Sequence, residues 1–204
     1  MAHDAASAGE GSASPTIALA ADGDVVLVVG PECRRLRASS LFVKNASLVL
    51  KAMLGPNFKE GQQLTQLDDV EIPLPDDNAE ALEIVLTTIH GHNDKVPTTL
   101  SPQLLLQIAI TVDKYDCHNS LAFVIRVWQE SAYSAIKPSN GKGMWALAMA
   151  ALVLRLQQTF AKVTSSLTFA FNGPFLDLVG KEDCIPDRAT QLKTAGELFH
   201  MFGS

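Results

Sequence analysis

The chain has 204 residues, of which 47% are hydrophobic and 19% are charged, and this composition indicates a globular protein with room for one domain plus an extension, or for two small domains. Its net charge of -6 argues against a general nucleic-acid surface, because phosphate binding needs clustered lysines and arginines. The only local basic cluster, Arg34-Arg35-x-Arg37, lies on a predicted short strand. We therefore expect no direct nucleic-acid partner.

The cysteines and the apolar segments bear on where the protein works. Cys33, Cys117 and Cys184 are far apart and odd in number, which is typical of reduced intracellular thiols. The first residues lack the apolar centre of a secretory signal. The most apolar helix candidate, Met144–Leu154, is shorter than the about 20 residues that a bilayer requires. We expect a protein of the cytoplasm, the nucleus or both, with no membrane partner.

The first half of the chain alternates between strand and helix patterns. Residues 1–22 are predicted to be a disordered tail, although Thr16–Ala21 could instead lead into the first strand. The β-branched run Val25–Val29 predicts a buried strand that is stopped by Gly30-Pro31, and a shorter strand, Arg35–Ala38, follows at hairpin distance.

Two short helices should follow the hairpin. One is predicted around Ser40–Lys44, and a second is opened by Ser47 and ended by Gly55-Pro56. Residues 55–69 are predicted to form a loop, after which Val70–Ile72 alternates like a short strand that Pro73 and Pro75 break.

The next helices have clear start signals. Asp77 followed by Glu80 has capping-box spacing, so a helix should begin there, and its apolar stripe comprises Leu82, Val85, Leu86 and Ile89. Ser101-Pro102 predicts a second helix, with serine as the cap and proline at the first helical position. A third apolar pattern includes Leu121, Val124, Ile125 and Trp128.

These elements together resemble a BTB/POZ domain, in particular its short fungal-type members. The resemblance rests on an ordered set of segments: Asp24 to Val29, Leu36-Arg37-Ala38-Ser39-Ser40, Phe58-Lys59-Glu60, Ile72 to Asp76, Thr88 to Gly91 and Val112-Asp113-Lys114-Tyr115-Asp116-Cys117. It covers residues 23–137. It implies an α+β fold in which a small, mainly three-stranded sheet is covered by helices.

Residues 138–204 are predicted to be a helical C-terminal extension. Apolar residues near a 3.5-residue period indicate one helix or two packed helices; they are Trp145, Met149, Leu152, Leu156, Phe160, Val163 and Leu167. Because no partner repeat exists and the first half is apolar on nearly all faces, we expect this seam to pack on the body of the protein instead of forming a free coiled coil. Asn172-Gly173-Pro174 breaks the pattern, and a last helix should run from Pro186-Asp187 to Met201.

Residues with catalytic or metal-binding chemistry do not occur at functional spacings. His90, His92 and Asp94, or Cys117 beside His118, could suggest a metal site, but neither group has a second ligand pair at zinc spacing, so we interpret them as turn and junction residues. The sequence contains no nucleophile elbow and no phosphate-binding P-loop. We expect neither an enzyme nor a cofactor.

The resemblance also implies a dimer-interface region around Asp24, Ser39 and Ser40. In many animal BTB dimers a buried aspartate pairs with a basic residue at this place, whereas serines occupy the matching positions here. A buried unpaired aspartate is costly, so Asp24 should accept backbone hydrogen bonds as a strand-start or turn residue. We expect a weak homodimer or a monomer.

Phe58, Lys59 and Glu60 are the candidate partner-binding residues. Family members that bind cullin scaffolds resemble this chain in having a hydrophobic-x-Glu triplet in the same loop. Either Phe58 projects as an interface anchor or its ring folds back onto the core. The sequence thus predicts a protein–protein interaction module that acts as an adaptor for a cullin-type ubiquitin ligase; the alternative is a self-associating scaffold or transcription-associated protein with no ligase role.

Overall fold

The computed structural model describes residues 15–64, 70–137 and 139–170 of the chain. Within them the chain forms four strands and eight helices, which confirms the mixed α+β class. The strands are β1 (Thr16–Ala18), β2 (Val25–Val29), β3 (Arg34–Ala38) and β4 (Val70–Leu74). They form one sheet in the order β1-β3-β2-β4, in which β2 and β3 are antiparallel and both outer strands are parallel to their neighbours.

The first strand corrects two expectations. The sheet has four strands and not mainly three, and the added strand, Thr16–Ala18, lies within the segment predicted to be a tail. It pairs along β3, and the backbone amide of Leu19 then donates to the carbonyl of Arg37 over 2.9 Å. A three-residue edge strand has too short a pattern to be recognised before its neighbour is known. The prediction of disorder for residues 1–14 lies outside the described residues.

The central strand β2 is buried, as its apolar run predicts. Leu27 is 1% exposed and lies between Leu36 of β3 and Ile72 of β4 in register. On the opposite face an ion pair between Arg35 of β3 and Glu71 of β4 crosses over β2. One face of the sheet therefore contributes to the core, and charged side chains cover part of the other face.

Pro73 lies inside β4 and does not end it. The amide of Val70 donates to the carbonyl of Asp24, just before β2, and the carbonyl of Leu74 accepts from the amide of Gly30, just after β2. Because successive N–H groups of a strand point to opposite sides, an N–H at position 73 would point away from β2. β4 is an outer strand, so the proline removes no hydrogen bond from the ladder.

Helices α1 (Ser40–Ala46) and α2 (Leu48–Met53) follow β3. Ser47 caps α2 as predicted, since its Oγ accepts from the amide of Leu50 over 3.0 Å. A third helix, α3 (Lys59–Leu64), occupies the segment predicted to be a loop. Its residues, KEGQQL, carry no apolar stripe, which is why periodicity does not detect it.

The N-cap of helix α4 (Ala79–Ile89) lies one residue later than predicted. Asn78 is the N-cap, and its side chain accepts from the amide of Ala81 over 2.9 Å. Asp77 is instead buried, and its Oδ2 accepts from Lys114 Nζ over 2.7 Å and from the Tyr115 hydroxyl over 3.1 Å. These distant partners, and not a cap position, therefore account for Asp77. Burial also raises the pKa of the Tyr115 hydroxyl.

Four longer helices complete the described chain: α5 (Pro102–Lys114), α6 (His118–Ala135), α7 (Gly141–Val153) and α8 (Gln157–Ala170). Ser101 caps α5 through the amide of Leu104, as predicted. The predicted seam is divided between α7 and α8, and the turn between them contains Arg155 at a φ of 59°. The expected helix to Met201 lies outside the described residues.

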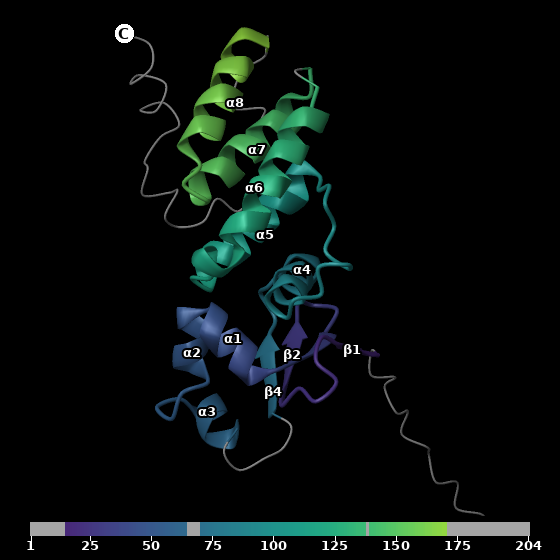
Figure 1. Cartoon of the computed structure of the whole chain (residues 1–204), viewed down its shortest axis with the longest axis vertical. Helices are drawn as coiled ribbons and strands as arrows, with labels where there is room; N and C mark the ends of the chain where they lie inside the picture. The colour runs from purple at the N-terminus through teal and green to yellow at the C-terminus, as the bar shows by residue number, and fades with distance from the viewer. Residues whose placement is uncertain (1–14, 65–69, 138, 171–204) are drawn as a thin grey trace, which may run out of the picture.

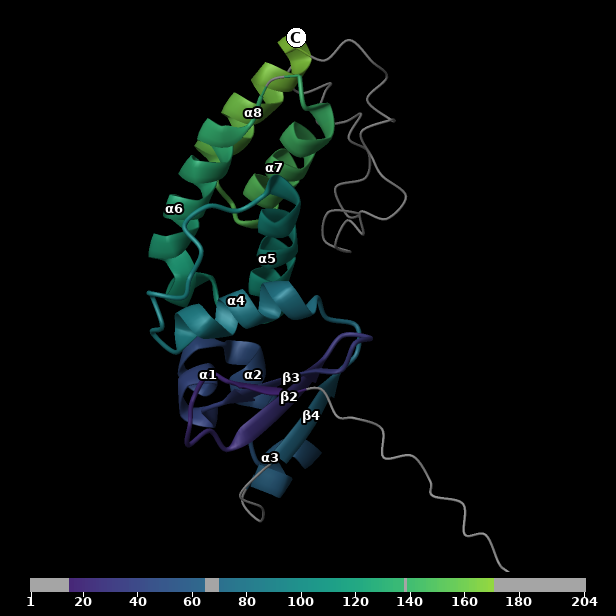
Figure 2. The same cartoon turned by 90° about the vertical axis from the view of Figure 1, so that its right-hand side faces the viewer.

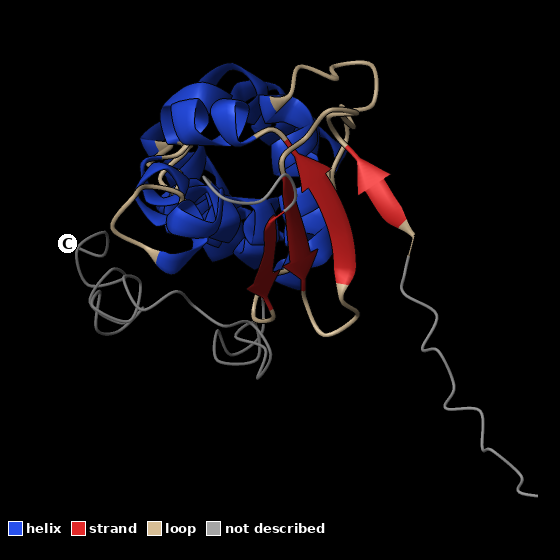
Figure 3. Cartoon of the chain, turned by 90° about the horizontal axis from the view of Figure 1, so that it is seen from below, coloured by secondary structure: helices blue, strands red, loops and turns tan. Residues whose placement is uncertain are grey.

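The helices extend the molecule away from the sheet. Figures 1 and 2 show the sheet with α1, α2 and α3 at one end, α5 to α8 at the other, and α4 between them. Figure 3 shows the sheet along one side of the helices. Helix α7 packs against α5, and α8 packs against α7, so residues 141–170 dock on the preceding helices.

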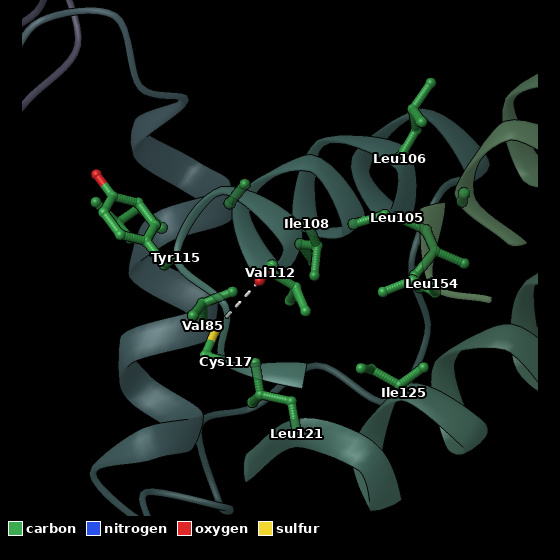
Figure 4. Packing of buried hydrophobic residues seen from close by; sticks show 14 of the residues in the cluster. Val85, Leu105, Leu106, Ile108, Val112, Tyr115, Cys117, Leu121, Ile125 and Leu154 are labelled. Atoms are coloured by element: carbon green, nitrogen blue, oxygen red, sulfur yellow. Dashed lines mark hydrogen bonds between the residues drawn. The ribbon is translucent and has the colours of Figure 1, made fainter. Parts of the chain in front are cut away.

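One continuous core joins the two ends. Val85 of α4, Ile108 of α5 and Leu154 at the end of α7 belong to the same buried cluster as Leu27 of the sheet. Figure 4 shows the part of this cluster between α4 and α6, where Cys117 lies with its Sγ 3.8 Å from the carbonyl oxygen of Val112. Burial raises the pKa of the Cys117 thiol to about 12, so it packs as an inert apolar group.

Candidate protein-interaction surface

Phe58 stands at the start of α3 and half of its side chain is exposed. Its backbone amide donates to the carbonyl of Gly55 over 3.2 Å, and its carbonyl accepts from the amide of Gln62 over 3.0 Å. The turn therefore continues directly into the helix, and the ring remains 51% exposed. Phe58 is therefore not one of the buried core residues, and half of it is accessible at the surface.

Gly61 fixes α3 against the turn before it. A Cβ atom at this position would overlap the carbonyl group of Gly55, so the backbones of residues 55 and 61 approach more closely than any side chain permits. Gly61 is buried although its helix is polar. Only glycine fits here, and the close packing places the backbone of α3 directly against the turn that precedes Phe58.

The two neighbours of Phe58 are available for contact. Lys59 is exposed and Glu60 is partly exposed, and neither forms a salt bridge with another described residue. Figures 1 and 2 show α3 at the end of the molecule opposite α7 and α8. The three predicted residues therefore share one end of the protein, away from the C-terminal helices.

Asp24 and Ser40 meet at the start of α1. The Ser40 amide donates to Asp24 Oδ1 over 2.6 Å, and the Ser40 hydroxyl donates to Oδ2 over 2.6 Å. Asp24 therefore accepts a backbone hydrogen bond, as predicted, and a side-chain bond in addition. Burial opposes its ionisation, but the hydrogen bonds from Ser40 outweigh burial and lower the pKa of Asp24. One chain alone satisfies this carboxylate.

Ser39 is held by a histidine that sequence analysis assigned to a turn. The amide of Ser39 donates to His90 Nε2 over 3.0 Å, so the proton of the neutral ring is on Nδ1, which donates to the carbonyl of Leu86 over 2.7 Å. Burial lowers the pKa of His90. His92 Nε2 lies 2.6 Å from the carbonyl oxygen of Leu19. Both histidines connect backbone segments.

The remaining predicted groups have structural partners as well. Arg34 binds Glu83 over 2.9 Å, and Arg37 donates to the carbonyl of Gly23 over 2.8 Å. The short basic cluster is thus engaged within the chain. In the part of the chain that the structure describes, no three His, Cys, Asp or Glu side chains are grouped so that they could hold a metal ion.

A second exposed surface lies on α1 and α2, and the sequence patterns did not identify it. Leu41 is 65% exposed, Phe42 49% and Leu48 65%, although all three are large apolar residues. The phenylalanine ring lies 5.3 Å from the ring of His90. The sequence feature that could have indicated this surface is the pair Leu41-Phe42. Adjacent residues of a helix point in different directions, so a helix of seven residues does not bury both on one face.

Comparison of the sequence with protein-family models and with curated proteins finds no match in either. Among residues 15–64, 70–137 and 139–170, no helix is both long enough and apolar enough to cross a membrane.

Proposed function

We propose that this chain is a protein–protein interaction module of the BTB/POZ type that acts as an adaptor for a cullin-type ubiquitin ligase. The observation that carries the proposal is Phe58, an exposed aromatic ring at the place where the family resemblance puts a cullin-binding triplet. A half-exposed phenylalanine contributes little to its own fold and offers apolar area to a partner.

The packing of the turn supports the same proposal. An anchor residue gives more affinity when it is already held in its binding position, because less conformational entropy is lost on association. The close approach of Gly61 to Gly55 packs the backbone on both sides of Phe58 together. Glu60 lies beside the ring in the first turn of α3 and can provide charge complementarity at the rim.

Replacing Phe58 by alanine is expected to abolish cullin capture and to leave the fold intact. Truncating a central aromatic anchor costs about 2 kcal/mol or more, which is roughly thirtyfold in affinity. Glu60→Ala should weaken binding only in part, because a rim charge mainly affects the association rate. Binding of a purified cullin by titration calorimetry, together with the melting temperature of each variant, measures both effects.

Phe123→Ala is the matched control. Phe123 is 83% exposed on α6, so its loss removes an equally apolar surface ring from another place. Its cullin affinity should equal that of the parent chain. A parent chain that captures no cullin, combined with a lowered melting temperature for Phe58→Ala, rejects the adaptor function.

The second candidate is a self-associating scaffold or transcription-associated protein with no ligase role. The exposed apolar residues on α1 and α2 favour it, because large apolar side chains at the surface offer area that a partner chain can bury. This candidate requires neither Phe58 nor a cullin.

Self-association should be weak. Asp24 is bonded to Ser40 of its own chain and is not available to fix a charged pair across a dimer. Light scattering at low micromolar concentration should give the mass of a monomer, with dimer at higher concentration. A tight dimer whose mass does not change with salt contradicts this expectation.

A further inference from the structure

A cleft of about 950 Å³ lies where three segments of the chain meet, and Phe58 is not among its lining residues. The α1–α2 corner contributes Leu48 and Val49, the junction of α5 and α6 contributes Asp116, and the turn between α7 and α8 contributes Arg155. Leu48 is 65% exposed and Val49 is 40% exposed, so one wall offers apolar area to a ligand.

Asp116 and Arg155 occupy the same strained backbone position in two unrelated turns. Their φ angles are 47° and 59°, in the left-handed region that favours glycine. Each follows the cap of a helix: the amide of Cys117 donates to the carbonyl of Val112 over 3.1 Å, and the amide of Leu156 donates to the carbonyl of Ala151 over 2.8 Å. Two of the three described non-glycine residues with positive φ thus line one cleft.

These two side chains carry opposite charges and face solvent. Both residues are exposed, and neither forms a salt bridge with another described residue. Lys114, which also lines the cleft, is bound to Asp77. A non-glycine residue with positive φ lowers the stability of the fold relative to glycine. Its presence at both positions therefore suggests that the side chains have a use.

We infer that this cleft binds a protein segment that presents an apolar side chain together with one basic and one acidic residue. The apolar side chain packs on Leu48 and Val49, the basic group pairs with Asp116, and the acidic group pairs with Arg155. The charges set the direction of the bound segment, and the apolar contact supplies most of the affinity. This surface is additional to the one around Phe58 and requires no cullin.

A synthetic peptide array tests the inference with the full chain. Each peptide has one leucine, one lysine and one glutamate at one to four residues' distance from one another, and every order of the three residues is present. The parent chain should prefer one order by about two- to fivefold, the range that one or two exposed ion pairs support. The double variant Asp116→Lys with Arg155→Glu keeps non-glycine residues at both positions and should prefer the peptide in which lysine and glutamate are exchanged.

Three further variants separate the alternatives. Leu48→Asp should lose binding to the array, whereas Phe58→Ala should keep it, which distinguishes this site from the proposed adaptor surface. Arg155→Gly should raise the melting temperature and weaken binding, because the strain is relieved and the charge is lost. The inference is overturned if the parent binds no peptide, if the charge-swapped chain keeps the parent's preference, or if Leu48→Asp changes the mass of the protein in solution, since a second copy would then occupy the cleft.

Discussion

A chain that ends at Asn140 is expected to lose its cooperative fold and to aggregate. Removing α7 uncovers part of α5, a helix whose side chains include Leu105 and Ile108, both at most 1% exposed in the full chain. Exposing two such side chains costs about 3–6 kcal/mol, which is a large part of the total stability of a typical domain. The free energy of unfolding in urea and the binding of an apolar dye measure this loss.

A chain that ends at Ala170 is the matched control, because it retains α7 and α8. The difference between the two truncations assigns the effect to these helices. If the shorter chain is as stable and as monodisperse as the full chain, residues 141–170 are an independent module and their packing on α5 contributes nothing to the fold.

Leu27→Ala is expected to lower the free energy of unfolding by about 2–5 kcal/mol, the usual range for truncating a buried leucine. Leu27 lies in the central part of the sheet between Leu36 and Ile72, both of which are buried. Strand pairing on both sides prevents the backbone from collapsing into the cavity, so the cost should be near the upper end of this range.

Val28→Ala is the comparison for this prediction. Val28 is adjacent in β2 but points to the other face and is only partly buried. Its truncation should cost clearly less than that of Leu27. A change of less than about 0.5 kcal/mol for Leu27→Ala would place the side chain outside the core and contradict the sheet described above.

The sequence predicts correctly the features whose interacting groups are close together in the chain. The caps at Ser47 and Ser101 bond to amides three residues away, and the apolar run of β2 determines its own burial. Asp24 accepts a backbone hydrogen bond, as a general rule for carboxylates predicts, but only the structure identifies Ser40 as the donor.

The patterns that were misread depend on residues far away in the chain. Asp77 has the spacing of a helix cap, but Lys114 and Tyr115 offer it a charged partner and a hydroxyl, and Asn78 caps the helix instead. Pro73 breaks an isolated strand pattern, yet the position of β4 at the edge of the sheet makes its missing N–H harmless.

The candidate surface divides in the same way. The family resemblance points to Phe58, Lys59 and Glu60, whereas the exposure of the ring and the presence of α3 directly after it are known only from the structure. The cleft beside Leu48 could not be predicted, because helices from three parts of the chain form it. Local sequence determines helix capping, the burial of the central strand and the chemistry of each residue, because these depend on nearby residues. The packing of the helices determines which side chains remain exposed and which distant charges share a cleft.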